Sequence, residues 1–256
     1  MRNLRVAAVV AVAVAVAVCL CFPAWAQEKP GTVAMIYTVK AKGFDSEPLA
    51  QAIKKHYDWH RQHHDTTAWF VWQVVTGDNA GQFLGGSFGH HWKDFDARPD
   101  FDKADDADFF AHVLPLAERA VPAFYEFLPE MSSPTGAKEP SAMTQLTHYF
   151  IKPSGIAAFS DAIREITAAL DKAGFPIHYE WYRLVSGGEG PHWVLAVARA
   201  NWAAMEPPDK GLEDALAGVV GPRRSAELVA AVRDNTRSTY SEMLQYRPDL
   251  SYIPGK

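Results

Sequence analysis

The sequence predicts an α+β fold in which one structural unit is used twice. Shifting the chain against itself by 110 residues aligns residues 34–96 with residues 144–206 without a gap, and the residue types agree along the whole stretch. Within each copy, runs rich in β-branched and aromatic residues alternate with stretches of helical spacing. A segment rich in proline and glycine, residues 132–141, separates the two copies.

Each copy is predicted to begin with a strand and a helix. The strands are expected at residues 32–40 and 145–151, and the helices at residues 46–64 and 157–173. Ser46 suits the N-cap of the first helix, because a serine hydroxyl accepts hydrogen bonds from the free backbone N–H groups there. Gly174 is a suitable stop for the second helix, since glycine readily adopts the left-handed conformation that ends many helices.

A hairpin and a second helix are predicted to complete each copy, because glycine-rich turns join two β-rich runs in both. The hairpin strands are expected at residues 68–76 and 82–90 in the first copy, and at residues 178–186 and 192–200 in the second. The closing helices are expected at about residues 104–127 and 221–243, and short last strands near residues 128–132 and 245–252.

This order of strand, helix, two strands, helix and strand is that of a ferredoxin-like βαββαβ unit. Its sheet carries helices on one face only, so a second copy in the same chain is expected to cover the other face. We place the first ferredoxin-like repeat at residues 27–132, a linker at residues 133–142 and the second repeat at residues 143–256.

Four aromatic residues add to this pattern. Trp92 and Trp202 follow the third strand of each copy, and Tyr125 and Tyr240 lie in the predicted closing helices. Together with the tandem units, these residues resemble the dimeric α+β barrel superfamily, which includes NIPSNAP-like proteins, antibiotic-biosynthesis-type monooxygenases, haem-degrading enzymes and chlorite-dismutase-like proteins. The resemblance implies an intramolecular barrel and, for chemistry, oxygen-dependent oxidation or haem handling, but it assigns no member family.

The first 26 residues have the three parts of a secretory signal peptide. Arg2 and Arg5 precede an apolar run at residues 6–22, and the small-x-small sequence at residues 24–26 supplies a cleavage site. A membrane anchor is disfavoured because the run, about 17 residues, is at the lower limit for a bilayer span. A lipoprotein is disfavoured because neither Cys19 nor Cys21 follows a small residue. We therefore expect an exported protein, periplasmic or extracellular.

Cleavage removes both cysteines, so the mature chain is expected to have no disulfide, no thiolate nucleophile and no cysteine metal ligand. Its 230 residues include 23 basic and 30 acidic side chains, a formal charge of −7. This charge and the lack of a basic cluster disfavour nucleic acid and, after signal cleavage, a membrane as partners. A small-molecule ligand is the expected partner, a homo-oligomer stays open, the cofactor stays unknown, and no residue is assigned to a metal.

The two copies differ most at their first helices. The second copy has an apolar stripe that includes Ile166 and Leu170, whereas the first copy has His56 and His60 at the matching positions. Burying an unpartnered imidazole costs about 1–3 kcal/mol, so these two residues need polar partners or a wet cavity. The same side of the first helix continues with His63 and His64.

Three interpretations of these histidines stay open. In the first, the helix end emerges into solvent and the histidines are surface groups that interact with the helix C-terminus. In the second, His56 and His60 line a polar pocket and act as catalytic bases, with His63 and His64 as ligand-binding neighbours. In the third, the pair binds a metal ion or haem iron, because residues four apart on a helix can point at one ion.

The third strand of the first copy is also unusual, because it contains Gly85, Gly86 and Gly89 where the second copy has larger side chains. Glycine inside a strand marks a bulge or the close approach of a ligand or another backbone. Taken with the histidines, this predicts a cavity in the first copy between its first helix and its sheet. His90 and Trp92 are candidate ligand-binding residues from the sheet side.

Two further features have both a structural and a functional interpretation. Arg183 lies in the middle of a strand, and its counterpart in the first copy is the polar Gln73. We expect a buried hydrogen-bond network at the interface between the copies, with ligand binding by Arg183 as the alternative. The aspartate-rich residues 100–108 are interpreted as a solvated loop and helix start, since they lack the pattern of a calcium loop.

The resulting hypothesis is that the exported protein binds a small apolar or aromatic ligand in a cavity of the first copy. His56 and His60 would serve as polar contacts and general bases, with oxidative chemistry of the kind the resemblance implies. A non-catalytic envelope protein for assembly or partner binding is the alternative, and a haem- or metal-binding oxidoreductase is a second. The sequence has no nucleophile triad, phosphate loop or dinucleotide fingerprint.

Overall fold

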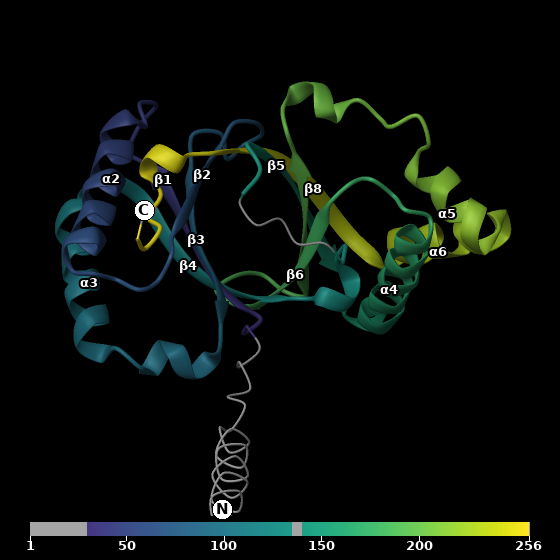
Figure 1. Cartoon of the computed structure of the whole chain (residues 1–256), viewed down its shortest axis with the longest axis horizontal. Coiled ribbons are helices and arrows are strands. Elements are labelled where there is room, and N and C mark those ends of the chain that lie inside the picture. Colours follow the sequence, from purple (N-terminus) through teal and green to yellow (C-terminus); the bar gives the residue numbers. More distant parts are fainter. Residues whose placement is uncertain (1–29, 135–139, 256) are drawn as a thin grey trace, which may run out of the picture. The chain divides into compact units, whose positions relative to one another are not determined.

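Eight antiparallel strands close into a barrel in the order β1-β3-β2-β8-β5-β7-β6-β4 (Figure 1). The structure is a computed structural model that describes residues 30–134 and 140–255. The predicted signal peptide and the middle of the predicted linker lie outside the described residues. The barrel and its helices belong to the unit Gly31–Lys256.

The two copies supply four strands each, and their elements follow in the predicted order. The first copy consists of β1 (Val33–Ala41), α2 (Glu47–Gln62), β2 (Phe70–Val74), β3 (Phe83–His90), α3 (Pro99–His112) and β4 (Ala117–Phe127). The second copy consists of β5 (Met143–Ile151), α4 (Ile156–Lys172), β6 (Tyr179–Ser186), β7 (His192–Arg199), α5 (Leu212–Val220), α6 (Pro222–Asn235) and β8 (Thr236–Tyr246). The repeat predicted from the shift of 110 residues is confirmed, because β1 and β5 are offset by that number.

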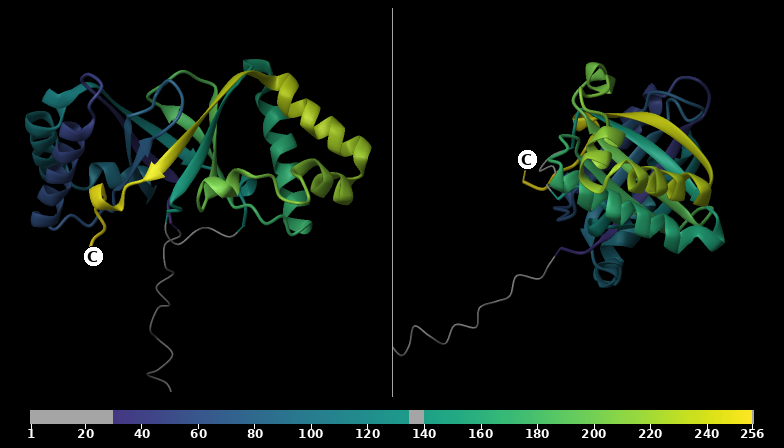
Figure 2. Two further views of the ribbon diagram at one scale, coloured as in Figure 1. Left: turned by 90° about the horizontal axis from the view of Figure 1, so that it is seen from above. Right: turned by 90° about the vertical axis from the view of Figure 1, so that its right-hand side faces the viewer.

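The barrel closes because the last strand of each copy pairs with both copies. β4 lies between β1 of its own copy and β6 of the other copy, and β8 lies between β5 and β2. In Figure 2 the yellow strand β8 runs from the helices of the second copy across to the strands of the first. The predicted intramolecular α+β barrel is therefore the observed fold.

The closing helices are shorter than predicted, and the strands that follow them are longer. The helix expected to reach residue 127 ends at His112, and β4 occupies the rest of that segment. The helix expected to reach residue 243 ends at Asn235, where β8 begins. Tyr125 and Tyr240 consequently lie in strands, which corrects the prediction. Pro115, in the turn before β4, interrupts the helical pattern because proline cannot continue a helix.

The helix ends follow the prediction in part. Gly174 lies just beyond α4 with φ +63°, as expected for a glycine that ends a helix. Ser46 precedes α2, but its hydroxyl accepts a hydrogen bond from Nε2 of Gln73 (3.1 Å) and caps nothing. Oδ1 of Asp45 accepts instead from the backbone N–H of Glu47 at 2.9 Å.

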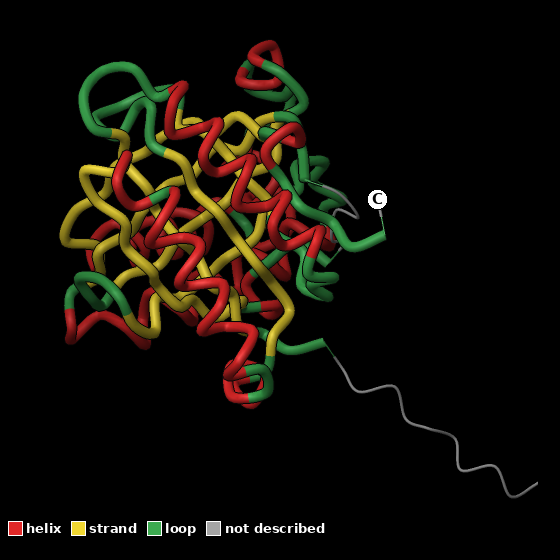
Figure 3. The backbone as a smooth tube through the Cα atoms, turned by 90° about the vertical axis from the view of Figure 1, so that its left-hand side faces the viewer, coloured by secondary structure: helices red, strands yellow, loops and turns green. Residues whose placement is uncertain are grey.

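The outer and inner faces of the sheet are covered differently. The helices cover the outer face at two sides of the barrel, with α2 and α3 over the strands of the first copy (Figure 3) and α4 to α6 over those of the second. One apolar core fills the space beneath each helical layer, and a smaller third cluster lies on the inner face. No helix among the described residues has the length and apolar character to span a membrane.

Candidate functional site

The barrel encloses a cavity of about 460 Å³, within the range of small-molecule sites. Its wall comes from alternate residues of the strands, because successive side chains of a strand point to opposite faces of the sheet. Aromatic and aliphatic side chains make up much of the wall, among them Phe70, Trp72, Leu84, Phe88, Tyr182, Val194 and Leu244. The cavity is therefore suited to a largely apolar or aromatic molecule.

One polar cluster breaks this apolar wall, and all three of its members come from the second copy. Nδ1 of His148, on β5, lies 3.0 Å from Nε2 of His192, on β7. Nε2 of His148 lies 3.4 Å from Oε1 of Glu242, on β8. Oε2 of Glu242 accepts a hydrogen bond from Nδ2 of Asn79 (3.0 Å), a residue of the first copy. The cluster thus places a buried carboxylate and two imidazoles in a row.

The row favours one arrangement of protons. A carboxylate can only accept, so Nε2 of His148 carries its proton towards Glu242 and Nδ1 of His148 accepts from Nε2 of His192. Nδ1 of His192 is then the unprotonated, basic nitrogen. Burial and the neighbouring His148 lower the pKa of His192 to about 4, so His192 is neutral at pH 7. The cluster can therefore accept a proton at Nδ1 of His192, and Glu242 orients the two imidazoles.

Tyrosines lie beside this cluster and stay protonated. Burial, with a smaller contribution from Glu242, raises the pKa of Tyr125 to about 12. Burial and Glu242 also raise the pKa of Tyr240, whose ring stacks on His148 with ring centroids 4.2 Å apart. Tyr182 likewise has a raised pKa through burial, and its hydroxyl donates to Glu180 at 2.7 Å. Phenol groups in the wall can therefore donate hydrogen bonds near neutral pH.

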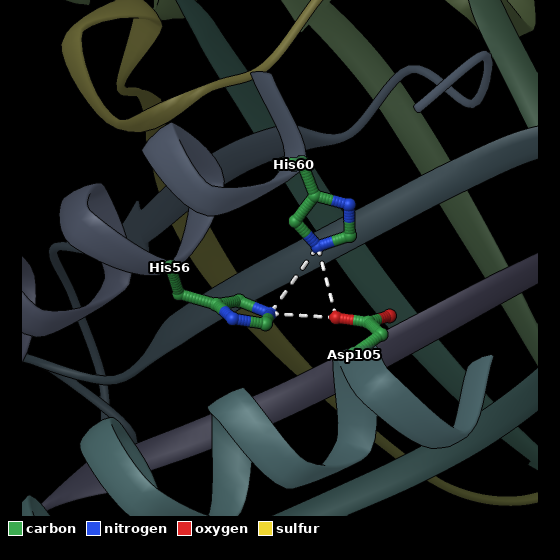
Figure 4. A group of neighbouring side chains, drawn as sticks. All are labelled: His56, His60 and Asp105. Atoms are coloured by element: carbon green, nitrogen blue, oxygen red, sulfur yellow. Dashed lines mark hydrogen bonds and ion pairs between the residues drawn. The ribbon is translucent and has the colours of Figure 1, made fainter. Parts of the chain in front are cut away.

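A second histidine cluster lies outside the barrel, between α2 and α3. His56 and His60 are buried on α2, and their Nε2 atoms lie 3.3 Å apart. Oδ1 of Asp105, from α3, lies 3.3 Å from Nε2 of His56 and 3.1 Å from Nε2 of His60 (Figure 4). The aspartate-rich segment is helical, as the predicted helix start implied, but it is not a solvated loop, because α3 turns Asp105 towards the histidines.

The Nδ1 atoms of both imidazoles are hydrogen-bonded to carboxylates. Nδ1 of His56 donates to Oδ2 of Asp108, and Nδ1 of His60 donates to Oδ2 of Asp65, each at 2.8 Å. Asp65 also accepts from Arg98 and from the backbone N–H of Thr67. Burial raises the pKa of Asp65, but these hydrogen bonds outweigh burial and lower it to about 2. Asp65 is therefore ionised and can only accept, which fixes the proton of His60 on Nδ1.

This arrangement directs three lone pairs at one point: the two Nε2 atoms and Oδ1 of Asp105. Burial lowers the pKa of His56. Burial also lowers that of His60, but the neighbouring carboxylates of Asp105 and Asp65 outweigh burial and raise the pKa. Among the described residues, His56, His60 and Asp105 are the group whose ligand atoms could hold a metal ion, all within 4.8 Å of one another.

The cavity predicted between the first helix and its sheet is wrong. That space is filled by an apolar core that includes Leu49, Ile53 and Tyr57. Gly85 serves this close packing, because a Cβ there would lie 2.9 Å from the hydroxyl of Tyr57. Gly86 lies on the inner face instead, where a Cβ would lie 2.9 Å from the ring of Phe88. The large cavity lies on the opposite, inner face of the same sheet, and neither His56 nor His60 lines it.

The other predicted ligand-binding histidines and Trp92 also lie away from the barrel cavity. His63 and His64 are exposed at the end of α2, and Nδ1 of His63 lies 2.8 Å from the backbone carbonyl of Trp59. Nε2 of His90 lies 2.6 Å from the hydroxyl of Ser87. Trp92 is half exposed and packs against the rings of Phe95 and Phe124.

Arg183 lies where the two copies meet, as predicted, but it is exposed and the predicted buried network is wrong. It forms an ion pair with Glu126, its cross-strand neighbour between β6 and β4. Its counterpart Gln73 accepts a hydrogen bond from Arg247 (3.0 Å) at the other junction, between β2 and β8. Arg183 borders a smaller hollow near Glu126 and Trp193, separate from the barrel cavity.

Sequence reasoning missed His148, His192 and Glu242. The signal was available in the repeat, because Thr38 and Gln82 occupy the positions that His148 and His192 take in the second copy. Glu242 could not be recognised, since its segment was predicted as helix and a strand places it on the inner face. The polar row lies on the inner faces of β5, β7 and β8, the first, third and last strands of the second copy.

Comparisons with known proteins agree with the fold. No family model matches the chain, and no curated protein matches it in sequence. An anthrone oxidase-like protein superposes with a TM-score of 0.58 and 13% identity, over 90% of this chain and 95% of that one. A protein described as a candidate monooxygenase from Lactobacillus acidophilus gives a TM-score of 0.55 and 11% identity, over 89% and 98%. Chlorite dismutase from Candidatus Nitrospira defluvii gives 0.50 and 10%, over 86% and 92%.

At these identities the likeness concerns the fold alone. These neighbours belong to the dimeric α+β barrel superfamily, and this chain has the same fold, with both halves of the barrel in one chain. No family within the superfamily is assigned.

Proposed function

We propose that this protein binds a small aromatic molecule inside its barrel and removes a proton from it with His192. The observation that carries the proposal is the row Glu242–His148–His192 at the edge of an aromatic cavity. A neutral imidazole is a proton acceptor near pH 7, and the lowered pKa of His192 keeps it in that form. Glu242 and His148 orient the base, and protonated tyrosines stabilise negative charge that develops on the ligand.

The proposed substrate class is a phenolic or keto-aromatic molecule with an acidic C–H or O–H group. The anthrone oxidase-like neighbour suggests a tricyclic ketone, and the aromatic wall of the cavity supports it. The overall reaction would be oxidation by dioxygen, in which the CH₂ group of anthrone becomes C=O. Two C–H bonds and the O–O bond break, one oxygen atom of dioxygen becomes the carbonyl oxygen, and the other leaves as water with the two protons. After His192 takes the first proton, the electron pair left on carbon reduces dioxygen and forms the C–O bond.

Haem, which the chlorite dismutase neighbour would suggest, is not supported by His148. Nδ1 of His148 is hydrogen-bonded to His192 at 3.0 Å, and its buried Nε2 makes no hydrogen bond but faces Oε1 of Glu242 at 3.4 Å. Binding iron through His148 would break this row, so we derive no step through haem. We further propose that the protein acts after export, because residues 1–26 read as a signal peptide.

The test uses anthrone as the probe with the untagged mature chain, residues 27–256. Binding is followed by quenching of the tryptophan fluorescence, to which Trp72 in the cavity wall contributes, and oxidation by oxygen consumption and anthraquinone absorbance. The His192→Gln variant is expected to bind anthrone within about threefold of wild type but to oxidise it roughly 10²–10⁴ times more slowly, the usual contribution of a positioned base.

A matched pair of variants locates the binding site. Ala196→Phe fills the cavity, whereas Ala203→Phe adds the same ring on the exposed turn after β7. Only Ala196→Phe should abolish quenching. Quenching that both variants retain would place anthrone elsewhere and contradict the proposal. Binding without oxidation in wild type would leave a binding protein and remove the catalytic part, and a Soret band after haemin addition that is lost in His148→Gln would favour haem.

A further inference from the structure

We propose that His56, His60 and Asp105 form a binding site for one divalent first-row transition metal ion, with zinc as the best fit. The site lies between α2 and α3 on the outer side of the sheet (Figure 4). It is separate from the barrel cavity, and none of its three residues lines that cavity. It therefore does not depend on the proposed function.

The distances between the three ligand atoms fit a common ion. Two Nε2 atoms and one Oδ1 atom form a triangle with sides of 3.3, 3.3 and 3.1 Å. Ligands about 2.0–2.1 Å from a tetrahedral zinc ion lie about 3.3–3.4 Å apart, and those of an octahedral ion lie about 3.0 Å apart. The triangle is close to one face of a zinc tetrahedron and leaves a fourth position for water or another ligand.

The surroundings are those of a metal-binding histidine pair. Metal-bound histidines usually donate their other ring N–H to a carboxylate or carbonyl group. Both histidines do so here, His56 to Asp108 and His60 to Asp65, each at 2.8 Å. In the neutral imidazoles, whose single protons are held on Nδ1, the two Nε2 atoms present lone pairs to each other and to Asp105. Oδ1 of Asp105 is buried and has no hydrogen-bond partner in the described part of the chain. A cation at the centre satisfies all three atoms.

A metal ion at this point would also attach α3 to the barrel. None of the residues of α3 is fully buried, and its apolar contacts with the first core come from the partly buried Phe109 and from Phe101 against Trp59. In the second copy, by contrast, α5 and α6 are anchored by buried residues such as Leu216 and Leu228. Asp105 bound to an ion shared with α2 would add a polar link to these contacts. The side chain of Asp105 is 23% exposed, which gives an ion a path from solvent.

The donor set indicates which ions bind. Imidazole nitrogen suits zinc, copper, nickel and iron, whereas calcium and magnesium prefer sites made of oxygen atoms. Two histidines and one carboxylate are also the ligand set of many iron(II) sites. Cobalt(II) distinguishes the geometries, because tetrahedral cobalt absorbs visible light far more strongly than octahedral cobalt.

The experiment uses the untagged mature chain, residues 27–256, stripped with a chelator and then titrated with zinc sulfate by calorimetry and by dialysis with metal analysis. We expect one zinc ion per chain and an intense visible spectrum with cobalt(II). At roughly 100 times the Kd, bound zinc should raise the Tm by roughly 5–10 °C. Calcium at the same concentration should leave the Tm unchanged.

Matched variants decide whether these residues bind the ion. Asp105→Asn should weaken zinc binding by more than about 100-fold. Asp108→Asn changes only the group that accepts the hydrogen bond from Nδ1 of His56, and should weaken binding by about 10–100-fold. Asp106→Asn on the same helix and His63→Gln on α2 serve as controls that should bind like wild type. Circular dichroism confirms that each variant is folded.

Two outcomes would overturn the proposal. One is that the stripped wild-type chain takes up less than about 0.2 equivalents of zinc. The other is stoichiometric zinc that Asp105→Asn retains with unchanged affinity, since the ion would then lie elsewhere. Stoichiometric binding of iron(II) or cobalt(II) with a weak octahedral spectrum, lost in Asp105→Asn, would keep the site but correct the preferred metal.

Discussion

The two copies of the repeat place their ionisable groups on opposite faces of the same barrel. In the first copy the polar cluster is outside, where His56 and His60 replace the apolar Ile166 and Leu170 of the second. In the second copy the polar cluster is inside, where His148 replaces Thr38. At each of these positions only one of the two copies has a histidine.

A duplicated scaffold can therefore carry two separate polar clusters, one in each copy. The outer cluster of the first copy is surrounded by carboxylates and joins two helices. The inner cluster of the second copy faces a cavity to which both copies contribute. A buried histidine is tolerated only with partners of its own, so each cluster carries its acidic residues with it.

The largest effect should come from moving a histidine into the wrong copy. Leu170→His puts an imidazole in the apolar core beneath α4, where it lacks carboxylate partners. We expect the free energy of unfolding to fall by about 3–5 kcal/mol, from lost packing and an unsatisfied polar group. Urea denaturation followed by circular dichroism measures it.

The control for that variant is Lys172→His, an exposed position at the end of the same helix, which should change stability by less than about 0.5 kcal/mol. If Leu170→His lost less than about 1 kcal/mol, this site in the second copy would accept histidine as readily as the first copy does. The contrast between the copies would then have no energetic basis.

The inner cluster should make stability depend on pH. Since the pKa of His192 falls from 6.5 to about 4 on folding, the unfolded chain binds more protons between these values. The free energy of unfolding should therefore fall as the pH drops from about 7 to about 4, with about 2–3 kcal/mol of the loss due to His192. Urea denaturation at several pH values measures the slope.

In His192→Gln the free energy of unfolding should not show the part of this decrease that is due to His192, because glutamine does not titrate. Contributions of the outer histidines are common to both proteins and cancel in the difference. Identical pH slopes for wild type and His192→Gln would show that His192 is not held neutral by burial.

The smallest effect is expected at the junction of the copies. Arg183 and Glu126 form an exposed ion pair, with side chains 47% and 35% exposed. Such pairs contribute about 0–1 kcal/mol, so Arg183→Gln should alter the free energy of unfolding by no more than that. A loss above about 2 kcal/mol, checked against Glu126→Gln, would show that the junction depends on this pair.

Much of the fold followed from the sequence because the repeat makes each copy a check on the other. The first strands, first helices and hairpins were predicted within a few residues. The last strands were not, because β4 and β8 follow their helices closely. Part of their pairing is with strands of the other copy, and the local sequence pattern carries no information about such distant contacts.

The candidate site was predicted only in part, for a related reason. Periodicity showed that His56 and His60 share a helix face, but the carboxylates that hold them come from Asp65 and from α3, elsewhere in the chain. The cavity was predicted on the wrong face of the sheet, because glycines that make room for Tyr57 and Phe88 were interpreted as room for a ligand.

The most direct test of the division between the copies is one crossed measurement: zinc affinity and the anthrone oxidation rate in both His60→Gln and His148→Gln. We expect His60→Gln to lose zinc binding and keep the oxidation rate, and His148→Gln to keep zinc binding and lose at least about 90% of the rate. If His60→Gln abolished oxidation while zinc binding survived in it, the first copy's histidines would be the reactive groups. The assignment of the two clusters would then be contradicted.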